Sequence, residues 1–510
     1  MSDTWDLLVV GGGINGVAIA RDAAGRGLKV LLCEKGDLAS ATSSASSKLV
    51  HGGLRYLEHG DFRLVRESLA EREVLLRMAP YLVRPMRFVL PQGPGSRPRW
   101  LVHLGLFLYD RLGGARSLPG AQSLDLRRDP LGAPLRAPGA GFVYADCRVD
   151  DARLTVTTAR DAAERGALIL TRTELVAARR NGEGWRATLH GPDGTPREVT
   201  ARILVNAAGP WVVDVLHLAG LGTHAALRLV KGSHIVVPRL YPGDHAYLLQ
   251  NDDRRIVFVI PFEREFSLIG TTELPFSGDP ATAQVTEAEV VYLCDAVARW
   301  FVAPSRAADV VWRYAGVRPL YEDRARTAAA VTRDYVFDLD VAGAPALSIF
   351  GGKLTTHRRL AEHALARLAA YLPEIGRSWT AASHLPGGED ESAALMAELR
   401  RDYPFLMADT AERLAQSYGS DARRILGNAR RSEDLGRDFG HGFSEAELAW
   451  LVEREWAATA EDVLWRRSKL GLVMTPSEAQ EIAAYLARVT HGSGSPAAAA
   501  SAPAGQTAYR

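Results

Sequence analysis

Apolar and polar positions follow different patterns along this chain, and each pattern predicts a different kind of element. An apolar run at 7–10 leads into glycines, a helical stretch and a second apolar run at 29–33, which is the order strand, turn, helix, strand. Between 228 and 275 the two kinds of residue alternate, which predicts an antiparallel sheet. Beyond residue 386 the spacing is helical, and residues 491–510 show no periodicity, so we expect a helical C-terminal domain and a disordered tail.

The first of these units carries the spacing of a dinucleotide-binding βαβ unit. Gly11, Gly13 and Gly16 form G-x-G-x-x-G after the first strand and at the start of the helix. The first two glycines allow the backbone to approach a pyrophosphate, and the third allows the helix to pack against the strand. Glu34 ends the second strand, 18 residues after Gly16, where an acid is expected to bind a ribose hydroxyl. The motif predicts an adenine dinucleotide without separating FAD from NAD.

Three further segments place small or polar residues where a ligand is expected. Residues 37–60 form a long serine-rich stretch that ends in interleaved apolar, aromatic and basic residues, so we interpret it as a functional loop. The strand at 199–205 runs into Ala207, Ala208 and Gly209, which allow close backbone approach to something flat. Gly351 and Gly352 precede a helix whose positive end would face the same ligand.

Capping signals predict where several helices begin. Asp61 is expected to cap a helix that ends near Pro80, and Thr355 or Thr356 to cap the helix after Gly352. The segments S-E-A-E at 444–447 and T-P-S-E at 475–478 have the spacing of capping boxes.

Length and charge narrow the class of protein. A chain of 510 residues exceeds the size of a single core, so two or three domains are expected. Its 61 Lys and Arg nearly balance 60 Asp and Glu, which argues against nucleic-acid binding. The three cysteines form no C-x-x-C pattern, so we expect no zinc site, no disulfide framework and a reducing cytoplasm.

The sequence indicates neither export nor a membrane-spanning segment. The first strand begins so early that no signal peptide is expected, and no apolar run approaches the ~18 residues of a membrane span. The apolar segment within 97–112, flanked by Arg97, Arg99 and Arg111, is either a buried helix or an apolar surface that meets a membrane.

Several segments together resemble one family. The motifs GGGINGVAIARDAAGRGL, TSSASSKLVHGGLRYLEHGDFRLVRE, LVNAAGPW, KGSHIVVP, GVRPL and FGGKLTTHRRLAEHAL resemble the FAD-dependent glycerol-3-phosphate dehydrogenases of the aerobic respiratory type, over residues 5–490. The resemblance implies an α/β fold with a Rossmann-like FAD-binding domain of the D-amino-acid oxidase type, an antiparallel-sheet substrate domain and an α-helical C-terminal domain. The expected ranges are 1–90, 141–227 and 320–380 for the FAD-binding domain, 91–140 and 228–319 for the substrate domain, and 386–490 for the helical domain.

The resemblance also implies an activity and partners. Members of the family oxidise sn-glycerol 3-phosphate to dihydroxyacetone phosphate and pass the electrons through FAD to membrane quinone. A peripheral attachment to the anionic inner face of the plasma membrane is expected, through the basic helix at 357–368 with help from 97–112. A homodimer is compatible with this assignment. No calcium-binding loop is found in the sequence, and no metal is expected.

Site residues carry over from the matched motifs. His234 is the expected base, because histidine titrates near the operating pH, and His51 is its rival. Arg318 is expected to act in catalysis and in binding. The expected substrate contacts are Arg55, Tyr56, Arg318, Arg333 and Lys353. The expected cofactor contacts are Gly11, Gly13, Asn15, Gly16, Glu34, Thr42, Ser43, Ser47, His51, Ala208, Gly209, Gly352, Lys353, Leu354 and Thr355.

The sequence leaves three alternative functions open. A glycerol-3-phosphate oxidase would use the same site and pass electrons to oxygen. An amine or amino-acid oxidase of the same fold would need one carboxylate partner rather than several cations. A non-catalytic flavin-binding protein would hold a flavin that no polyol phosphate reduces.

Overall fold

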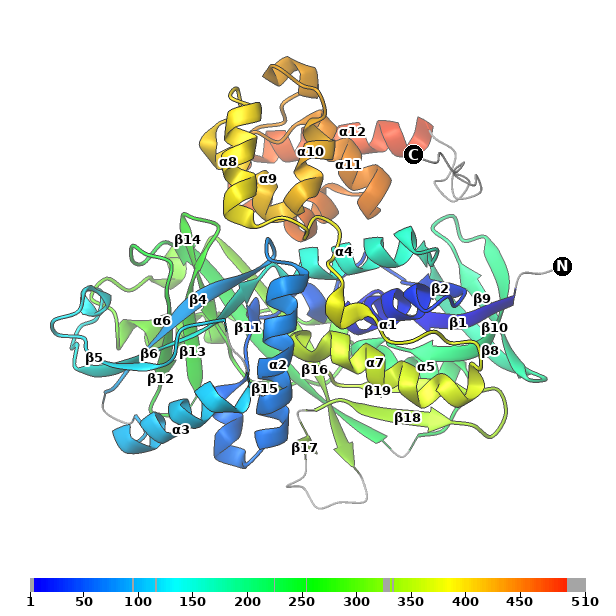
Figure 1. Cartoon of the computed structure of the whole chain (residues 1–510), viewed down its shortest axis with the longest axis horizontal. Coiled ribbons are helices and arrows are strands. Elements are labelled where there is room, and N and C mark those ends of the chain that lie inside the picture. The colour runs from blue at the N-terminus through cyan, green and yellow to red at the C-terminus, as the bar shows by residue number, and fades with distance from the viewer. Residues whose placement is uncertain are drawn as a thin grey trace.

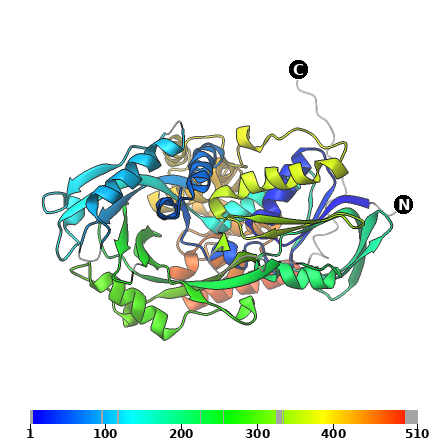
Figure 2. The same cartoon turned by 90° about the horizontal axis from the view of Figure 1, so that it is seen from below.

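The computed structural model describes residues 4–93, 96–114, 117–223, 225–253, 255–323, 331–332 and 334–492. These residues form two sheets that lie side by side and a group of helices that covers one end of them (Figure 1). The view from below separates the first sheet, at the right, from the second, at the left (Figure 2). The arrangement confirms the expected fold class.

The first sheet is centred on β1 (Thr4–Val10). It lies between two parallel neighbours, β2 (Val30–Cys33) and β10 (Pro196–Asn206). Leu7, Leu8 and Val9 are all completely buried, because a parallel strand with apolar side chains on both faces must be covered on both. The other strands are β7 (Leu168–Leu170), β8 (Glu174–Asn181), β9 (Gly184–His190), β18 (Val336–Asp340) and β19 (Ala346–Phe350).

Helices cover both faces of this sheet. One face packs against α1 (Ile14–Gly25), α4 (Asp151–Glu164) and α7 (His357–Leu368). The other face packs against α5 (Val212–Leu218) and the β8–β9 hairpin. The third glycine of the motif is required here, because a Cβ on Gly16 would lie 2.0 Å from the carbonyl oxygen of Gly11.

The second sheet is mostly antiparallel. Its order is β17-β16-β11-β14-β13-β12-β4-β6-β3, with β15 beside β11 and β5 beside β6. Its strands are β3 (Leu49–Val50), β4 (Val83–Pro91), β5 (Gln122–Asp125), β6 (Ala140–Val149), β11 (Ala225–Pro238), β12 (Ala246–Gln250), β13 (Ile256–Phe262), β14 (Phe266–Gly270), β15 (Leu274–Pro275), β16 (Trp312–Asp323) and β17 (Val331–Thr332). Strands β4 and β6, which the expected ranges largely group with the FAD-binding domain, pair in this sheet. Helices α2 (Phe62–Met78), α3 (Arg99–Leu112) and α6 (Glu287–Ala298) accompany it.

The C-terminal helices have a core of their own. They are α8 (Ser392–Asp402), α9 (Ala408–Tyr418), α10 (Ala422–Leu426), α11 (Glu445–Glu455) and α12 (Pro476–Gly492). Ser444 caps α11 by accepting a hydrogen bond from the backbone N–H of Glu447, and Thr475 does the same for Glu478. Both caps are therefore confirmed. The capping box is complete at Thr475, whose backbone N–H donates to Glu478, whereas within the described residues Ser444 makes the cap without the return bond from its own N–H.

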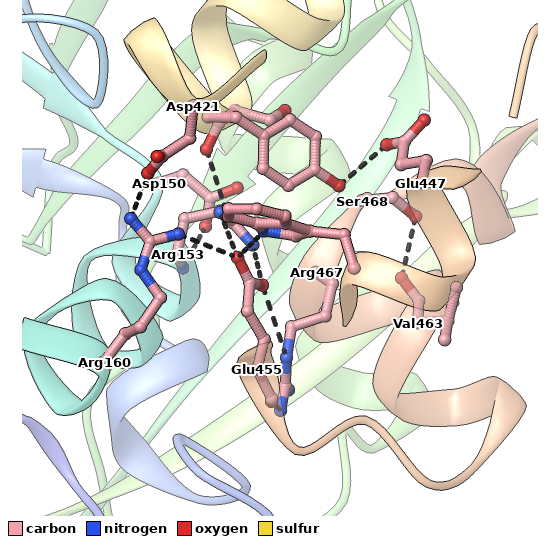
Figure 3. Close-up of polar contacts among 12 residues, drawn as sticks. Asp150, Arg153, Arg160, Asp421, Glu447, Glu455, Val463, Arg467 and Ser468 are labelled. Carbon is pink, nitrogen blue, oxygen red and sulfur yellow. Dashed lines mark hydrogen bonds and ion pairs between the residues drawn. The ribbon is translucent and has the colours of Figure 1, made fainter. Parts of the chain in front are cut away.

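Buried ion pairs fasten these helices to α4 (Figure 3). The guanidinium of Arg153 donates to both carboxylate oxygens of Glu455, and the two side chains are 1% and 0% exposed. Arg160 of α4 forms a second buried ion pair, with one carboxylate oxygen of Asp421. Charges this deeply buried are stable only when paired. These ion pairs therefore hold the C-terminal domain against α4, the helix that covers the first sheet.

The structure corrects two expected helix caps and the basic surface expected along α7. Asp61 and Thr356 occupy the cap positions of α2 and α7, but neither side chain accepts a capping hydrogen bond. Helix α7 does not present a basic surface along its length. Its apolar residues belong to the core, and Arg358 is 5% exposed and pairs with Glu71.

Candidate active site

A cavity of about 1480 Å³ opens between the two sheets. It is larger than the ~300–1,000 Å³ usual for a small ligand, so it can hold a dinucleotide together with a substrate. Its wall includes the start of α1, the serine-rich loop, the segment 351–355, the sides of β11 and β16, and residues of the C-terminal domain.

The nucleotide end is built from the glycine turn and Glu34. The Glu34 carboxylate accepts hydrogen bonds from the backbone N–H groups of Gly12 and Gly36, at 2.6 and 2.7 Å. Burial raises the pKa of Glu34, and these two bonds oppose the rise. The N-terminus of α1 faces the cavity, and its Ile14 N–H donates to Ser43 Oγ at 2.9 Å. Both the acid and the helix end are therefore in place for an adenosine diphosphate.

The serine loop is held by residues that sequence reasoning missed. Asp151, the first residue of α4, accepts from Ser46 Oγ at 2.7 Å and from Lys48 Nζ at 2.7 Å. On the other side, Thr42 Oγ1 donates to the carbonyl of Val317 on β16 at 2.7 Å. The loop is thus tied to α4, which covers the first sheet, and to β16 of the second sheet. The sequence signal for Asp151 was only an acid at the start of a helix.

The middle of the cavity fits a flat cofactor. Gly352 has φ +99°, and a Cβ there would lie 2.7 Å from Asn15 Nδ2, so backbone and amide approach each other closely. Asn15 Nδ2 donates to the Gly351 carbonyl at 3.1 Å, whereas its buried Oδ1 has no protein partner in the described residues. Of the other expected cofactor contacts, Gly16 packs against Gly11 and does not line the cavity, whereas the rest do, namely Gly11, Gly13, Ala208, Gly209, Leu354 and Thr355.

His234 lies beside the cavity. It is 1% exposed, its Nε2 is 2.9 Å from Ser47 Oγ, and its ring stacks on Tyr314 with centroids 4.9 Å apart. Ser47 and Tyr314 both line the cavity. Burial, with the nearby charges of Arg318 and Lys48, lowers the pKa of His234 well below its usual 6.5. The imidazole is therefore neutral at neutral pH, as a base must be, but it does not titrate near the operating pH, which corrects the reason for which the sequence favoured it.

His51 also lines the cavity and is the alternative base. Burial, then the charges of Lys353 and Arg318, lowers its pKa to about 4. Its backbone N–H donates to Thr355 Oγ1 at 3.3 Å, which joins the serine loop to the start of the α7 segment. His51 and Thr355 are both expected cofactor contacts, and this hydrogen bond brings them together.

The expected substrate cations meet in the same cavity. Arg55 and Arg318 lie on either side of Glu273, at 3.7 and 3.6 Å. The Lys353 ammonium lies 3.7 Å from the centre of the Tyr56 ring. Arg333, the remaining expected contact, lies outside the described residues.

Two residues of the cavity wall, Glu273 and Trp465, were not predicted from the sequence. Glu273 follows an alternating strand and reads as an ordinary surface acid. Trp465, in the segment Asp462–Arg467 of the C-terminal domain, stacks on Trp312 with centroids 4.5 Å apart. Trp312 in turn packs on Tyr314, so the C-terminal domain reaches the neighbourhood of His234.

The chain is similar to known proteins over most of its length. Residues 6–358 match the family model of FAD dependent oxidoreductases, and residues 378–493 match the C-terminal domain of alpha-glycerophosphate oxidase. The chain is 52% identical to D-erythritol 1-phosphate dehydrogenase of Brucella abortus, over 93% of this chain and 96% of the relative. It is 50% identical to aerobic glycerol-3-phosphate dehydrogenase of Escherichia coli, over 96% and 98%. The X-ray structure of a glycerol-3-phosphate dehydrogenase from Bacillus halodurans, complexed with FAD, matches with a TM-score of 0.76 and 28% identity, over 96% and 92%.

Proposed function

We propose, from the premise that this chain belongs to the FAD dependent oxidoreductase family and is closely related to its glycerol-3-phosphate dehydrogenases, that it oxidises sn-glycerol 3-phosphate to dihydroxyacetone phosphate. The physiological acceptor that we propose for the electrons is membrane quinone. Oxygen as the acceptor is the alternative, and peroxide formation measured against quinone reduction separates the two.

The residues of the chain divide the chemistry between them. The glycine turn, Glu34 and the segment 351–355 would hold FAD, which would supply the acceptor for the hydride from C2 of the substrate. Arg55 and Arg318 neutralise the phosphate, with Lys353 beside them. His234 is neutral and takes up the hydroxyl proton, and Ser47 connects its Nε2 to the cavity. The positive end of α1 faces the cavity, where it would attract the phosphates of the cofactor.

The observation that carries the proposal is that Arg55 and Arg318 share Glu273 in a cavity that continues to a dinucleotide site, and that the charge of Arg318 also acts on the neutral His234. An amino-acid substrate has no use for several cations, whereas a phosphate dianion does. The test is anaerobic mixing of the FAD-loaded protein with glycerol 3-phosphate and, separately, with glycerol. Only the phosphate is expected to bleach the flavin. A flavin that neither compound bleaches would support a non-catalytic flavin protein.

A second substrate deserves a parallel measurement. The relative at 52% identity is a D-erythritol 1-phosphate dehydrogenase, and the cavity is large enough for one more carbon. Steady-state kcat/KM with glycerol 3-phosphate and with D-erythritol 1-phosphate gives the preference. A ratio of at least ~10 in favour of the three-carbon compound is the expected result, and the reverse ratio would assign the chain to the four-carbon substrate.

We further propose peripheral attachment at the cytoplasmic face of the membrane through α3. Trp100, Leu104 and Phe107 of α3 are 69, 45 and 45% exposed, and Leu101, Leu104 and Leu108 also line the cavity. An apolar helix face with arginines beside it is typical of contact with an anionic membrane surface. Within the described part of the chain, no helix is long and apolar enough to cross a bilayer.

Flotation with anionic vesicles tests the attachment. Leu104→Glu is expected to reduce the floated fraction, because it places a charge on the face that enters the membrane. Met407→Glu, which changes a 64% exposed apolar residue on the C-terminal domain, serves as the control and is expected to float like the parent. Equal flotation of both variants would argue against α3. A homodimer stays a prediction, to be checked by sedimentation.

A further inference from the structure

Glu273 bridges the two arginines proposed to hold the phosphate. One carboxylate oxygen lies 3.7 Å from Arg55 Nη1, and the other lies 3.6 Å from Arg318 Nη1. The three side chains are 31, 35 and 36% exposed, in the order Arg55, Glu273, Arg318, and all three line the cavity. A carboxylate therefore lies where an anionic ligand would be attracted to both guanidinium groups.

A glycine between the strands makes this contact possible. Arg318 on β16 and Glu273, next to β15, flank the stretch of β11 that contains Gly232. A Cβ on Gly232 would lie 2.7 Å from Thr271 Oγ1 and 3.1 Å from Arg318 Nη2. Because Gly232 has no side chain, the arginine of one neighbouring strand and the acid of the other can meet across it.

We infer that Glu273 is an internal anion that occupies the phosphate position between Arg55 and Arg318 in the ligand-free protein and leaves it when substrate binds. The inference rests on the proposed function only for the identity of the anion that displaces it. Glu273 is a half-exposed side chain with several rotatable bonds, so it can turn into the cavity. Oxygens of the incoming phosphate then take the places of the two carboxylate oxygens of Glu273.

An internal competitor has a defined effect on affinity. While the carboxylate is in place the site is closed, and the apparent Kd of every external anion is raised by the inverse of the fraction of time that the site is open. This factor is the same for monoanions and dianions. A fixed negative charge that stayed near the site would act differently, since it would repel a dianion more than a monoanion. As a consequence of this exchange, carboxylate anions that bind the two arginines only weakly do not displace Glu273.

The exchange can be measured without turnover. Sulfate and acetate are titrated separately at constant ionic strength into the FAD-loaded protein, and binding is followed by the flavin absorbance and by the thermal unfolding temperature. In Glu273→Gln both anions are expected to bind ~5-fold more tightly than in the parent, which corresponds to about 1 kcal/mol. Glu273→Asp keeps the charge but shortens the reach, and is expected to give the same tightening.

Glu58→Gln is the matched control. Glu58 also lines the cavity and is 35% exposed on its side chain, but it pairs with Arg97. Its loss removes one negative charge from the same wall and is expected to change either Kd by less than ~2-fold. Unchanged Kd values in Glu273→Gln, tightening of sulfate alone, or weaker binding would each overturn the inference. A protein that glycerol 3-phosphate fails to reduce would contradict the proposed function and leave this anion result standing.

Discussion

Ser47 Oγ lies 2.9 Å from Nε2 of His234, and this contact joins the serine loop of the first sheet to a strand of the second. Ser47 lines the cavity, whereas His234 is almost completely buried. The pair offers a route by which a proton can pass from the cavity to a neutral base.

Replacing His234 is expected to slow the chemical step. His234→Gln should still bind FAD and substrate but reduce the flavin at least ~10²-fold more slowly, because a general base typically contributes ~10²–10⁴-fold. Anaerobic stopped-flow measures the rate. The lowered pKa of His234 adds a pH signature: protonation removes the base only well below pH 6.5, so the limiting rate should stay level through pH 6. A near-parental rate in the variant would make His234 structural and return the role to His51.

Replacing the phosphate-binding cations is expected to change KM more than kcat. Arg318→Ala and Lys353→Ala remove contacts that hold the phosphate equally in the ground and transition states, which is uniform binding. Steady-state kinetics over a wide range of substrate concentration measures both constants. Unchanged saturation by substrate in both variants would show that the phosphate lies elsewhere.

Gly270 is expected to be required for the position of the imidazole. A Cβ at this position would lie 2.1 Å from Cδ2 of His234, so Gly270→Ala must displace the ring that contacts Ser47. A fall in kcat with retained FAD content is the expected result. Gly222→Ala is the control, because a Cβ at Gly222 meets nothing within 4 Å. Equal activity of the two variants would contradict the assigned position of the base.

The ion pair of Arg153 and Glu455 is expected to stabilise the joined domains. Arg153→Met leaves a buried carboxylate without its main partner, which typically costs about 3–5 kcal/mol. Urea unfolding followed by tryptophan fluorescence measures the loss. Arg401→Met is the control, because Arg401 and its partner Asp402 are 72 and 45% exposed, and no measurable change is expected there. Similar stabilities for the two variants would refute the role of the buried pair.

Glu289 is expected to make the stability of the folded protein depend on pH. Burial alone would raise its pKa, but hydrogen bonds from Lys231, Thr286, Ser233 and Thr272 outweigh burial and lower the pKa from 4.5 to about 2. A carboxylate with a lowered pKa stabilises the folded protein above its unfolded pKa, and this contribution disappears as the pH falls from about 4.5 to about 2. After discounting for solvent screening it amounts to about 1–3 kcal/mol.

Urea midpoints at pH 6 and pH 3 test this dependence. Glu289→Gln should lower the midpoint at pH 6 and reduce the difference between the two pH values. Glu287→Gln, on the same helix with a side chain that is 76% exposed, should leave both midpoints unchanged. A pH difference that is equally large in Glu289→Gln and in the parent would contradict the prediction.

Local patterns in the sequence were sufficient for several features of the protein. The strand, the glycines and Glu34 define a dinucleotide turn because its geometry depends on residues close together in the chain. The caps at Ser444 and Thr475 involve backbone groups three residues away, so their spacing alone predicted them. The alternation in β11, β13 and β14 predicted their sheet for the same reason.

Tertiary structure decided what lies between those elements. Glu273 meets Arg55 and Arg318 only because β15 and β16 flank the same glycine of β11, and Trp465 reaches Trp312 from a domain more than 150 residues later in the sequence. Arg358 belongs to a basic stretch in the sequence but is buried against Glu71, so a run of cations did not reveal which of them face solvent. Such contacts join residues distant in the chain, and no local periodicity encodes the distance between two side chains from different strands.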